Sequence, residues 1–392
     1  MSTLNVSGTL FPDLAREASE SKDMQTDAIL PSQAIRELIA NGHVRACQEI
    51  TERQVQPASL DLRLGDIAYR VQASFLPRHS RVEPRIQQLG LGMGIVDLTR
   101  AAVFEKDCVY IVPLLEELHL PEGISARANP KSSTGRLDIF TRLITDSGDR
   151  FERVRPGYRG PLYAEIASRT FSVRVRAGMT LNQLRFIQGN PAKPSDKATR
   201  RLDQAKPLVW EEGAPKKAAI EKKSLKLSVN LRATDSPVIA YKAKRNTPVI
   251  DLAEINHYRP EDFWDVIEDL GNRGLILVQG DFYILASKEE IRVPPEWAAE
   301  MVSMDQDIGE FRIHYAGFFD PGFGYGTSDI KGTRAVLEVR AHEVPFLVEH
   351  GQTLGRLEYW RLQSRPDKIY GAGIGSSYQR QGLALSKHFK KS

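Results

Sequence analysis

The feature of this sequence that most constrains its fold is an internal repeat at a constant offset of 173 residues. The matching pairs are Tyr110 and Tyr283, Pro121 and Pro294, Glu165 and Glu338, Gly178 and Gly351, and Leu181 and Leu354. The ends of the two copies also read alike, AGMTLNQLRF at 177–186 and HGQTLGRLEY at 350–359. A period this long indicates two duplicated folding units and excludes a solenoid of short repeats.

The two copies differ most at polar positions. The first carries the segment KSSTGR at 131–136, where the same offset reads MDQDIG at 304–309, without a hydroxyl pair or an arginine. The second carries DPGF at 320–323, where the first reads RPGY at 155–158. This pattern predicts that the copies have kept different halves of one site.

Composition narrows the class of protein. The chain has 392 residues, enough for two or three domains with full cores. Its two cysteines, Cys47 and Cys108, lie far apart and form neither a disulfide framework nor a CxxC metal motif. The N-terminus has no secretory signal pattern, and no apolar run is long enough to span a membrane. We therefore expect a cytoplasmic protein without a membrane partner.

Positive charge is concentrated between the two copies. Residues 193–245 contain 14 Lys or Arg against 6 Asp or Glu, whereas the whole chain carries a formal net charge of +4. This region is rich in Pro and Ala and has poor hydrophobic periodicity, which favours a solvated linker. A phosphate-attracting surface is the alternative. Aromatic residues for base stacking are not interleaved with the charges, so nucleic acid is not the expected partner.

Short apolar runs punctuated by Gly and Pro predict a mainly β protein. A half-buried strand is expected at 59–65, where SLDLRLG alternates polar and apolar residues. Further strands are expected at 109–112 and 282–285. No long helices alternate with these strands, which disfavours a doubly wound α/β fold.

Two helices are predicted. The first begins at Ser32 as N-cap, runs through Ile39 and ends at Asn41 and Gly42. The second is expected around 260–267, in PEDFWDVI.

Five motifs occur in a fixed order along the chain. They are SSxxR after a predicted buried strand, AxxxDPGF, a Leu-Glu pair on the next strand, GxxLxxLxY, and a final YxxQ. In this order they resemble the deoxycytidine triphosphate (dCTP) deaminase branch of the deoxyuridine triphosphatase (dUTPase) superfamily, and the segment 32–65 is similar to that family's opening. The resemblance implies two tandem dUTPase-like distorted β-barrels, jelly-roll-like, with a few short helices.

The repeat and the resemblance together divide the chain into four segments. Residues 1–29 would form an N-terminal tail, residues 30–190 the first barrel with the phosphate loop, and residues 191–223 the basic linker. Residues 224–392 would form the second barrel, whose C-terminal tail covers the substrate. Sites of the family lie between neighbouring barrels, so the loop of the first copy would meet the strand and tail of the second. Whether they meet within one chain or in a homo-oligomer is left open by the sequence.

The segment 131–136 is the predicted phosphate loop. Hydroxyl groups on a turn donate to phosphate oxygens, and an arginine can hold two such oxygens with paired N–H groups. The resemblance implies that Lys131, Ser133 and Arg136 grip the triphosphate. It also implies that Ser132 helps to position the attacking water, which makes Ser132 and Arg136 part of the catalytic set. An ordinary polar turn is the alternative interpretation.

Glu338 is the predicted catalytic base. A carboxylate on an otherwise apolar strand is costly unless it faces solvent or performs chemistry. The resemblance implies that Glu338 takes a proton from the water that attacks C4 of cytosine and delivers protons to N3 and to the leaving ammonia. Val336 and Leu337 would contact the base, and the backbone carbonyl of Ala316 would hold the water.

Three more residues are implied to bind the substrate. Asp320, in the DPGF turn, would lie near the deoxyribose. Tyr370 and Gln381, in the C-terminal tail, would close over the nucleotide, and the position of the family's tail lysine reads Ser377. Glu165, the counterpart of Glu338, lacks these partners and is interpreted as a structural relic.

The predicted reaction needs no metal to activate water. Zinc deaminases use an HxE and a distant PCxxC motif, and neither occurs in this sequence. Magnesium is expected only on the triphosphate of the substrate. The resemblance thus implies hydrolytic deamination of dCTP to deoxyuridine triphosphate (dUTP) and ammonia, with dUTP or thymidine triphosphate (dTTP) as further ligands.

Two other functions stay open at this point. The segment GAGIGSS at 371–377 resembles the phosphate-covering tail of dUTPases, which favours hydrolysis of dUTP, either alone or after deamination. A non-catalytic protein would instead bind nucleotides or nucleic acid through the basic region.

Overall fold

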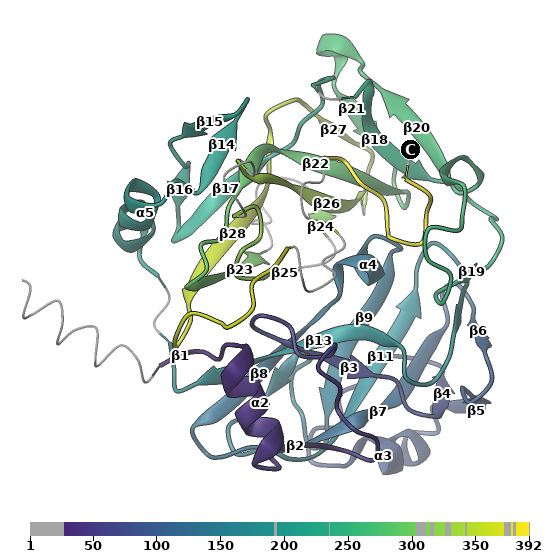
Figure 1. Cartoon of the computed structure of the whole chain (residues 1–392). Helices are drawn as coiled ribbons and strands as arrows, with labels where there is room; N and C mark the ends of the chain where they lie inside the picture. Colours follow the sequence, from purple (N-terminus) through teal and green to yellow (C-terminus); the bar gives the residue numbers. More distant parts are fainter. Residues whose placement is uncertain are drawn as a thin grey trace, which may run out of the picture.

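The computed structural model describes residues 27–191, 194–234, 236–302, 311–313, 317–325, 331–341, 343–371, 378 and 382–391. The protein is mainly β, as predicted. In Figure 1 the first copy fills the lower half of the molecule and the second copy the upper half, and the two halves meet along a central seam. The α-helices of the described residues are short: α2 (Ser32–Ala40), α3 (Val82–Gln88), α4 (Ser132–Gly135) and α5 (Asp196–Ala205). None of them is long and apolar enough to cross a membrane.

Two sheets build the first copy. One contains β2 (Val44–Ala46), β4 (Ile67–Val71), β5 (Gly92–Asp97), β7 (Val109–His119), β9 (Ile139–Thr145) and β11 (Arg159–Ser168). The other contains β1 (Ala28–Ile29), β3 (Leu60–Arg63), β8 (Ile124–Pro130), β10 (Arg153–Val154) and β13 (Thr180–Gln188).

Two sheets of the same kind build the second copy. One contains β14 (Val209–Glu211), β15 (Ala214–Lys216), β18 (Val238–Ala243), β20 (Trp264–Glu268), β22 (Phe282–Ile291), β24 (Phe311–Ile313) and β26 (Thr333–Ala341). The other contains β16 (Ile220–Glu221), β17 (Ser224–Ser228), β23 (Trp297–Val302), β25 (Phe318–Phe319) and β28 (Thr353–Arg361). The short strands β21 (Leu275–Leu277) and β27 (Phe346–Val348) form a separate pair.

Strand register shows that the sequence repeat is a structural duplication. Glu165 of β11 lies opposite Ile111 of β7, and Glu338 of β26 lies opposite Ile284 of β22. Both pairs are related by the same offset of 173 residues. Because one slipped residue would turn every side chain to the other face, the shared register keeps equivalent side chains on equivalent faces.

The two copies are interlocked through their cores. Strand β19 (Ile250–Asp251) of the second copy pairs in parallel with β12 (Val173–Val175) of the first, and β6 (Ala102–Phe104) completes this small sheet. Phe171 of the first copy packs edge-on against Trp264 of the second at 5.4 Å between ring centroids. One hydrophobic cluster therefore runs from the first copy into the second, and a further cluster lies wholly within the second.

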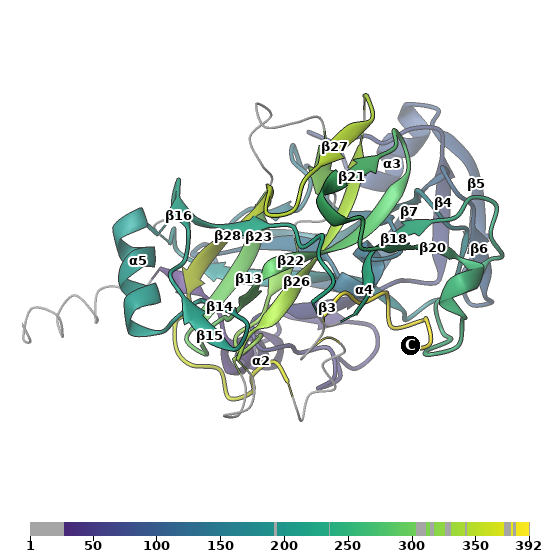
Figure 2. The ribbon, with the colours of Figure 1, turned by 90° about the horizontal axis from the view of Figure 1, so that it is seen from above.

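The region predicted as a solvated linker is folded. Helix α5, capped by the hydroxyl of Ser195, and strands β14 to β16 lie at one end of the second copy (Figures 1 and 2). Leu202, Leu208 and Ile220 are buried in the second core cluster. The sequence showed no clear sign of this packing, because only every third or fourth residue of a short amphipathic helix is apolar and most of the others are charged here.

Three local predictions need correction. The segment 260–267 is not a helix: a single 3-10 turn at Pro260–Asp262 leads into β20. The first helix is α2 and ends at Asn41 as predicted, but its N-cap is Pro31, and Ser32 lies inside the helix. Strand β3 is buried on both faces, because its polar residues are covered by ion pairs from other elements.

Candidate active site at the seam of the two copies

Strand β13 of the first copy holds the loop 131–136. The backbone N–H of Lys131 donates to the carbonyl of Leu181 at 2.9 Å, and the hydroxyl of Thr134 donates to the same oxygen at 2.9 Å. The Lys131 ammonium pairs with Asp61 of β3 and donates to Thr180 at 3.0 Å. The loop is therefore fixed on the sheet before any ligand binds.

Arg136, at the end of this loop, points into the seam and is buried. Its Nη1 donates to the carbonyl of Ala384 at 3.0 Å, and its guanidinium lies 3.7 Å from the ring centroid of Tyr378. Its Nε–H has no acceptor among the residues that the structure describes. The C-terminal segment thus orients Arg136 and leaves one donor free for a ligand.

A buried ion pair joins the loop to the strand that carries Glu338. Asp138, two residues beyond Arg136, pairs with Arg340 of β26, and neither carboxylate nor guanidinium is open to solvent. The hydroxyl of Thr170 links them, since it donates to Asp138 at 2.6 Å and accepts from Arg340 at 2.9 Å. This contact fixes the loop of the first copy relative to the strand of the second.

Glu338 lies on the face of β26 that looks into the seam, together with Val336. Burial raises the pKa of Glu338 to about 8, and the guanidinium of Arg136 acts in the opposite direction. In the described part of the chain Glu338 has no ion pair. A carboxyl in this setting can exchange a proton near neutral pH.

One small cavity, of about 50 Å³, brings the predicted residues of both copies together. Its lining includes Lys131, Ser132 and Arg136 from the first copy, and Asp320, Val336, Glu338 and Tyr370 from the second. The predicted meeting of the two copies therefore occurs within a single chain.

Three of the predicted residues need separate comment. Leu337 alternates to the opposite face of β26 and is fully buried in the second core cluster, so its side chain does not line the cavity, contrary to the prediction. Ala316 and Gln381 lie outside the described residues, so their predicted contacts stay predictions.

The turn 320–323 is shaped by Gly322 and packed against Tyr370. Gly322 has φ +94°, and a Cβ there would lie 2.9 Å from Cβ of Ile369 and 3.0 Å from the backbone nitrogen of Tyr370. Tyr370 donates its backbone N–H to the carbonyl of Pro321 at 2.7 Å. Only glycine fits this close approach, which explains the sequence DPGF better than turn propensity alone.

Asp320, the first residue of this turn, is buried at the cavity wall. Burial raises the pKa of Asp320 to about 6, whereas the guanidinium of Arg185 lowers it. Asp320 Oδ1 lies 3.5 Å from Arg185 Nη2 and accepts no hydrogen bond.

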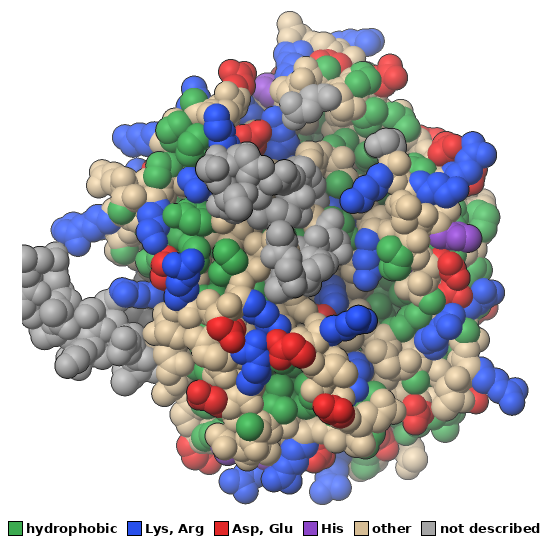
Figure 3. Space-filling view, viewed as in Figure 1, with side chains coloured by type: hydrophobic (Ala, Val, Ile, Leu, Met, Phe, Trp, Pro, Cys, Tyr) green, Lys and Arg blue, Asp and Glu red, His purple; other side chains and the backbone are tan. Residues whose placement is uncertain are grey.

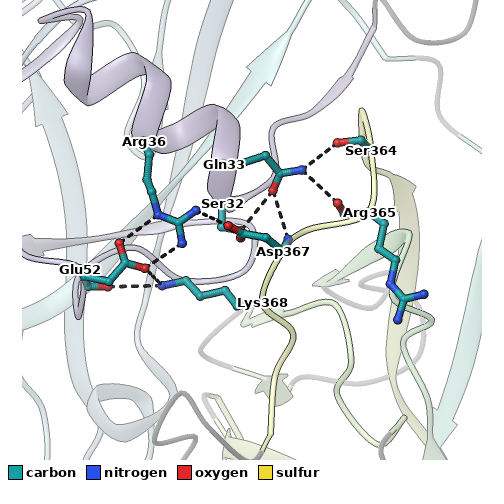
Figure 4. A network of polar contacts seen from close by, with 8 residues as sticks. All are labelled: Ser32, Gln33, Arg36, Glu52, Ser364, Arg365, Asp367 and Lys368. Carbon is teal, nitrogen blue, oxygen red and sulfur yellow. Dashed lines mark hydrogen bonds and ion pairs between the residues drawn. The ribbon is translucent and has the colours of Figure 1, made fainter.

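Helix α2 anchors the segment that leads to Tyr370 (Figure 4). Asp367 pairs with Arg36 and accepts from the hydroxyl of Ser32, and Lys368 pairs with Glu52 at 2.6 Å. These contacts join the N-terminal helix of the first copy to the C-terminal segment of the second. They place Tyr370 at the cavity although it lies in an irregular segment.

A larger and more open cavity, of about 1000 Å³, adjoins the first. The two share Lys131, Ser132, Asp320, Tyr370 and Tyr378, among others. Ser133 lines the larger one, as do four cationic side chains not predicted from the sequence, Arg36, Arg53, Lys368 and Lys387. In Figure 3, Lys and Arg side chains gather near the middle of the face, between the two halves of the molecule.

Lys387 is the most informative of these additions. It is partly buried, and burial together with the charge of Lys131 lowers the pKa of its ammonium group. The neighbouring Ser386 donates to the carbonyl of Ser133 at 2.8 Å, and Phe389 packs 5.5 Å from the ring of Phe263. The sequence signal was slight, since a lysine near a charged C-terminus is usually exposed.

Unsatisfied polar atoms around the two cavities indicate a polar ligand. Arg136 Nε, Asp61 Oδ1 and Asp320 Oδ1 are all buried without a hydrogen-bond partner among the described residues. A bound water, ion or polar ligand would satisfy them. The described residues contain no cluster of three or more His, Cys, Asp or Glu that could hold a metal ion.

The seam thus combines cationic side chains with a buried carboxyl whose pKa burial raises to about 8, which is typical of an enzyme site. The comparison with family models is more specific. Residues 26–190 match the N-terminal domain, and residues 195–389 the C-terminal domain, of 2'-deoxycytidine 5'-triphosphate deaminase (DCD). The chain therefore belongs to the dCTP deaminase family and is an enzyme.

Individual relatives agree with this assignment. A solved structure of 2'-deoxycytidine 5'-triphosphate deaminase from Agrobacterium tumefaciens is similar over 86% of this chain and 99% of that chain, with a TM-score of 0.80 and 46% identity. The proteins named "dCTP deaminase, dUMP-forming" from Parafrankia sp. and Streptomyces coelicolor are each 32% identical over 165 residues. These matches span 40% of this chain but 74% and 78% of the relatives, as expected when one unit of a duplicated chain aligns.

Proposed function

We propose that this enzyme hydrolyses dCTP to dUTP and ammonia at the seam, with Glu338 as the proton-transferring group. The observation that carries the proposal is the raised pKa of a buried, unpaired carboxyl in the same cavity as Ser132 and Arg136. The phosphate loop and Glu338 come from different copies of one chain, so we infer one complete site per chain.

Glu338 carries both protons of the water. In its ionised form Glu338 removes one proton from water as the oxygen attacks C4 of cytosine, and a tetrahedral intermediate with a C4 hydroxyl forms. Glu338 gives this proton to N3, then takes the proton of the C4 hydroxyl and gives it to the exocyclic amino group, so that ammonia leaves as the C4 carbonyl forms. A pKa of about 8 suits both directions of transfer: the protonated form predominates at neutral pH, and the ionised form that starts the reaction is still populated.

The other residues would bind and orient the substrate. Ser132 and Arg136 face the water and the phosphates, Val336 lies against the base, and Asp320 faces the deoxyribose. The larger cavity would hold the magnesium-bound triphosphate, where Lys131, Ser133 and Lys387 supply the cationic and hydroxyl donors. Lys387 would then stand in for the tail lysine that the sequence lacks at Ser377.

Ammonia release and the absorbance change from cytosine to uracil test this proposal on the purified chain. Glu338→Gln should abolish both signals, and Glu165→Gln, the same change at the equivalent position of the first copy, should leave them. Equal turnover in Glu338→Gln and wild type would remove Glu338 from the mechanism.

A second candidate function is favoured by the relatives named dUMP-forming. In that case dUTP would be hydrolysed further to dUMP and pyrophosphate by a second water. Pyrophosphate assayed beside ammonia distinguishes the two: ammonia alone supports the deaminase, and equal amounts of both support the dUMP-forming reaction.

A further inference from the structure

Arg185 is a buried cation that the proposed mechanism does not use. It lies in β13 between Leu184 and Phe186, and only 1% of its surface is exposed. Burying a guanidinium is costly unless charges and acceptors compensate, so its surroundings should show what it does.

All three close contacts of Arg185 are with the second copy. Its Nη1 lies 3.3 Å from the carbonyl of Ala299, and its guanidinium lies 3.8 Å from the ring centroid of Phe318. Its Nη2 lies 3.5 Å from Oδ1 of Asp320. Arg185 thus reaches from the first copy to the residue that faces the deoxyribose in the proposed site.

The equivalent of Arg185 in the second copy carries the opposite charge. In the first copy Arg185 lies opposite Arg127 across β13 and β8, and in the second Glu358 lies opposite Glu300 across β28 and β23. Arg127 and Glu300 meet across the seam in two contacts of 3.0 and 3.1 Å. Two arginines side by side in the first copy repel each other, and so do two glutamates side by side in the second copy. These repulsions are compensated only when the arginines of a first copy face the glutamates of a second copy.

We propose that Arg185 is a positioning residue, which holds the Asp320 carboxylate for contact with the deoxyribose and makes this contact depend on the pairing of unlike copies. The inference rests on the proposed function, in which Asp320 faces the sugar. Arg185 touches no predicted substrate atom and acts only through Asp320.

The charges around Asp320 agree with this role. Arg185 on β13 and Lys131 before α4 lower its pKa, and Asp61 on β3 raises it. Lys131 is already paired with Asp61, so Arg185 is the cation available to keep Asp320 ionised. Without Arg185, burial and Asp61 would raise the pKa of Asp320 further.

Arg127 is a matched control. It lies in register with Arg185 on the neighbouring strand, and it makes its own ion pair across the same seam. Its side chain is 35% exposed, and no contact joins it to Asp320. Arg127→Met therefore removes a charge from the seam and leaves the contact between Arg185 and Asp320 in place.

The test compares Arg185→Met, Arg185→Lys and Arg127→Met in the full chain. Three quantities are measured: KM and kcat for dCTP, the thermal midpoint, and the titration of Asp320, followed by NMR with ¹³C-labelled aspartate and assigned with Asp320→Asn. We expect Arg185→Met to raise KM by about tenfold, the equivalent of one lost hydrogen bond of about 1.4 kcal/mol. We expect a smaller change in kcat and an upward shift of the Asp320 titration. Arg185→Lys should restore the titration and part of KM, and Arg127→Met should lower only the thermal midpoint.

An unchanged KM and an unchanged Asp320 titration in a folded Arg185→Met variant would overturn the proposal, whatever its thermal midpoint. Should Arg185→Met not fold, Arg185→Gln, which keeps a donor for the Ala299 carbonyl without the charge, serves in the same comparison. The NMR titration does not require turnover. If the wild-type chain released no ammonia from dCTP, the proposed function would fail, and the titration would still decide whether Arg185 controls Asp320.

Discussion

The two copies carry a glutamate at equivalent positions of equivalent strands, Glu165 and Glu338, and these glutamates differ in the charged groups around them. Glu165 of β11 is buried against Arg142, which donates to it at 3.0 and 2.6 Å. Glu338 of β26 has no ion pair among the described residues, and burial raises its pKa to about 8. Duplication preserved the backbone position, and among the described residues only the glutamate of the first copy has an ion-pair partner.

Exchange of each glutamate for glutamine should give the largest contrast between the copies. We expect Glu338→Gln to lower kcat for dCTP by about 10²–10⁴-fold, the usual contribution of a general acid–base group. Glu165→Gln should keep kcat near the wild-type value and lower the thermal midpoint, because Arg142 loses its charged partner. Steady-state ammonia release and thermal unfolding measure both, and a comparable loss of kcat in Glu165→Gln would contradict the assignment of roles.

Ion pairs that join the copies should differ in strength according to their burial. Asp138→Asn breaks the buried pair with Arg340 and should destabilise the fold by about 3–5 kcal/mol. Arg176→Met removes a partner of Asp251 that is 44% exposed, also across the seam, and should cost about 1 kcal/mol or less. Urea unfolding compares the two, and equal losses would show that burial does not set the strength of these contacts.

The pH dependence of activity should report the environment of Glu338. We expect kcat/KM to rise with pH toward a midpoint of about 8, as the buried carboxyl loses its proton. Arg136→Met removes the positive charge that opposes the effect of burial, so this rise should move to higher pH, together with an increase in KM. If the midpoint of kcat/KM against pH were the same in Arg136→Met and wild type, the charge of Arg136 would have no effect on the pKa of Glu338.

The last expected effect is a gain in stability of Glu338→Gln over wild type that depends on pH. The folded protein keeps the Glu338 proton up to about pH 8, whereas an unfolded glutamate loses it near its ordinary pKa of about 4.5. As pH rises from about 4.5 to about 8, the unfolded state of wild type is therefore increasingly favoured. Glutamine has no proton to lose, so Glu338→Gln does not show this loss of stability. The thermal midpoint of Glu338→Gln should match that of wild type at pH 4 and exceed it progressively up to pH 8. A constant difference across this range would contradict the raised pKa.

Sequence alone predicted the parts of the site that short motifs define. The loop 131–136, Asp320, Glu338 and Tyr370 follow from a repeat and an ordered motif set, and the structure brings all of them to the two adjoining cavities. The sequence predicted that Val336 and Leu337 both contact the base. Side chains alternate along β26, so that of Val336 lines the cavity and that of Leu337 lies in the core.

What the sequence could not predict depends on contacts between distant segments. Arg185 appears in the sequence as one charge in a strand, and its contact with Asp320 exists only after the copies pack together. Lys387 lies about 250 residues beyond the loop 131–136 in the sequence, yet both line the larger cavity. Segment 260–267 was predicted as a helix from its composition, but the aromatic cluster around Trp264 places it in an extended strand at the seam.

Strand β19 ties the two copies into one folding unit. It belongs to the second half of the sequence, yet it forms the outer edge of a sheet in the first half, next to β12. A gene divided after residue 190 would give an N-terminal product with a bare strand edge and a C-terminal product with Ile250 and Trp264 stripped of their cover. Both fragments would be prone to aggregate. The two copies therefore depend on each other for a closed sheet edge and a covered core.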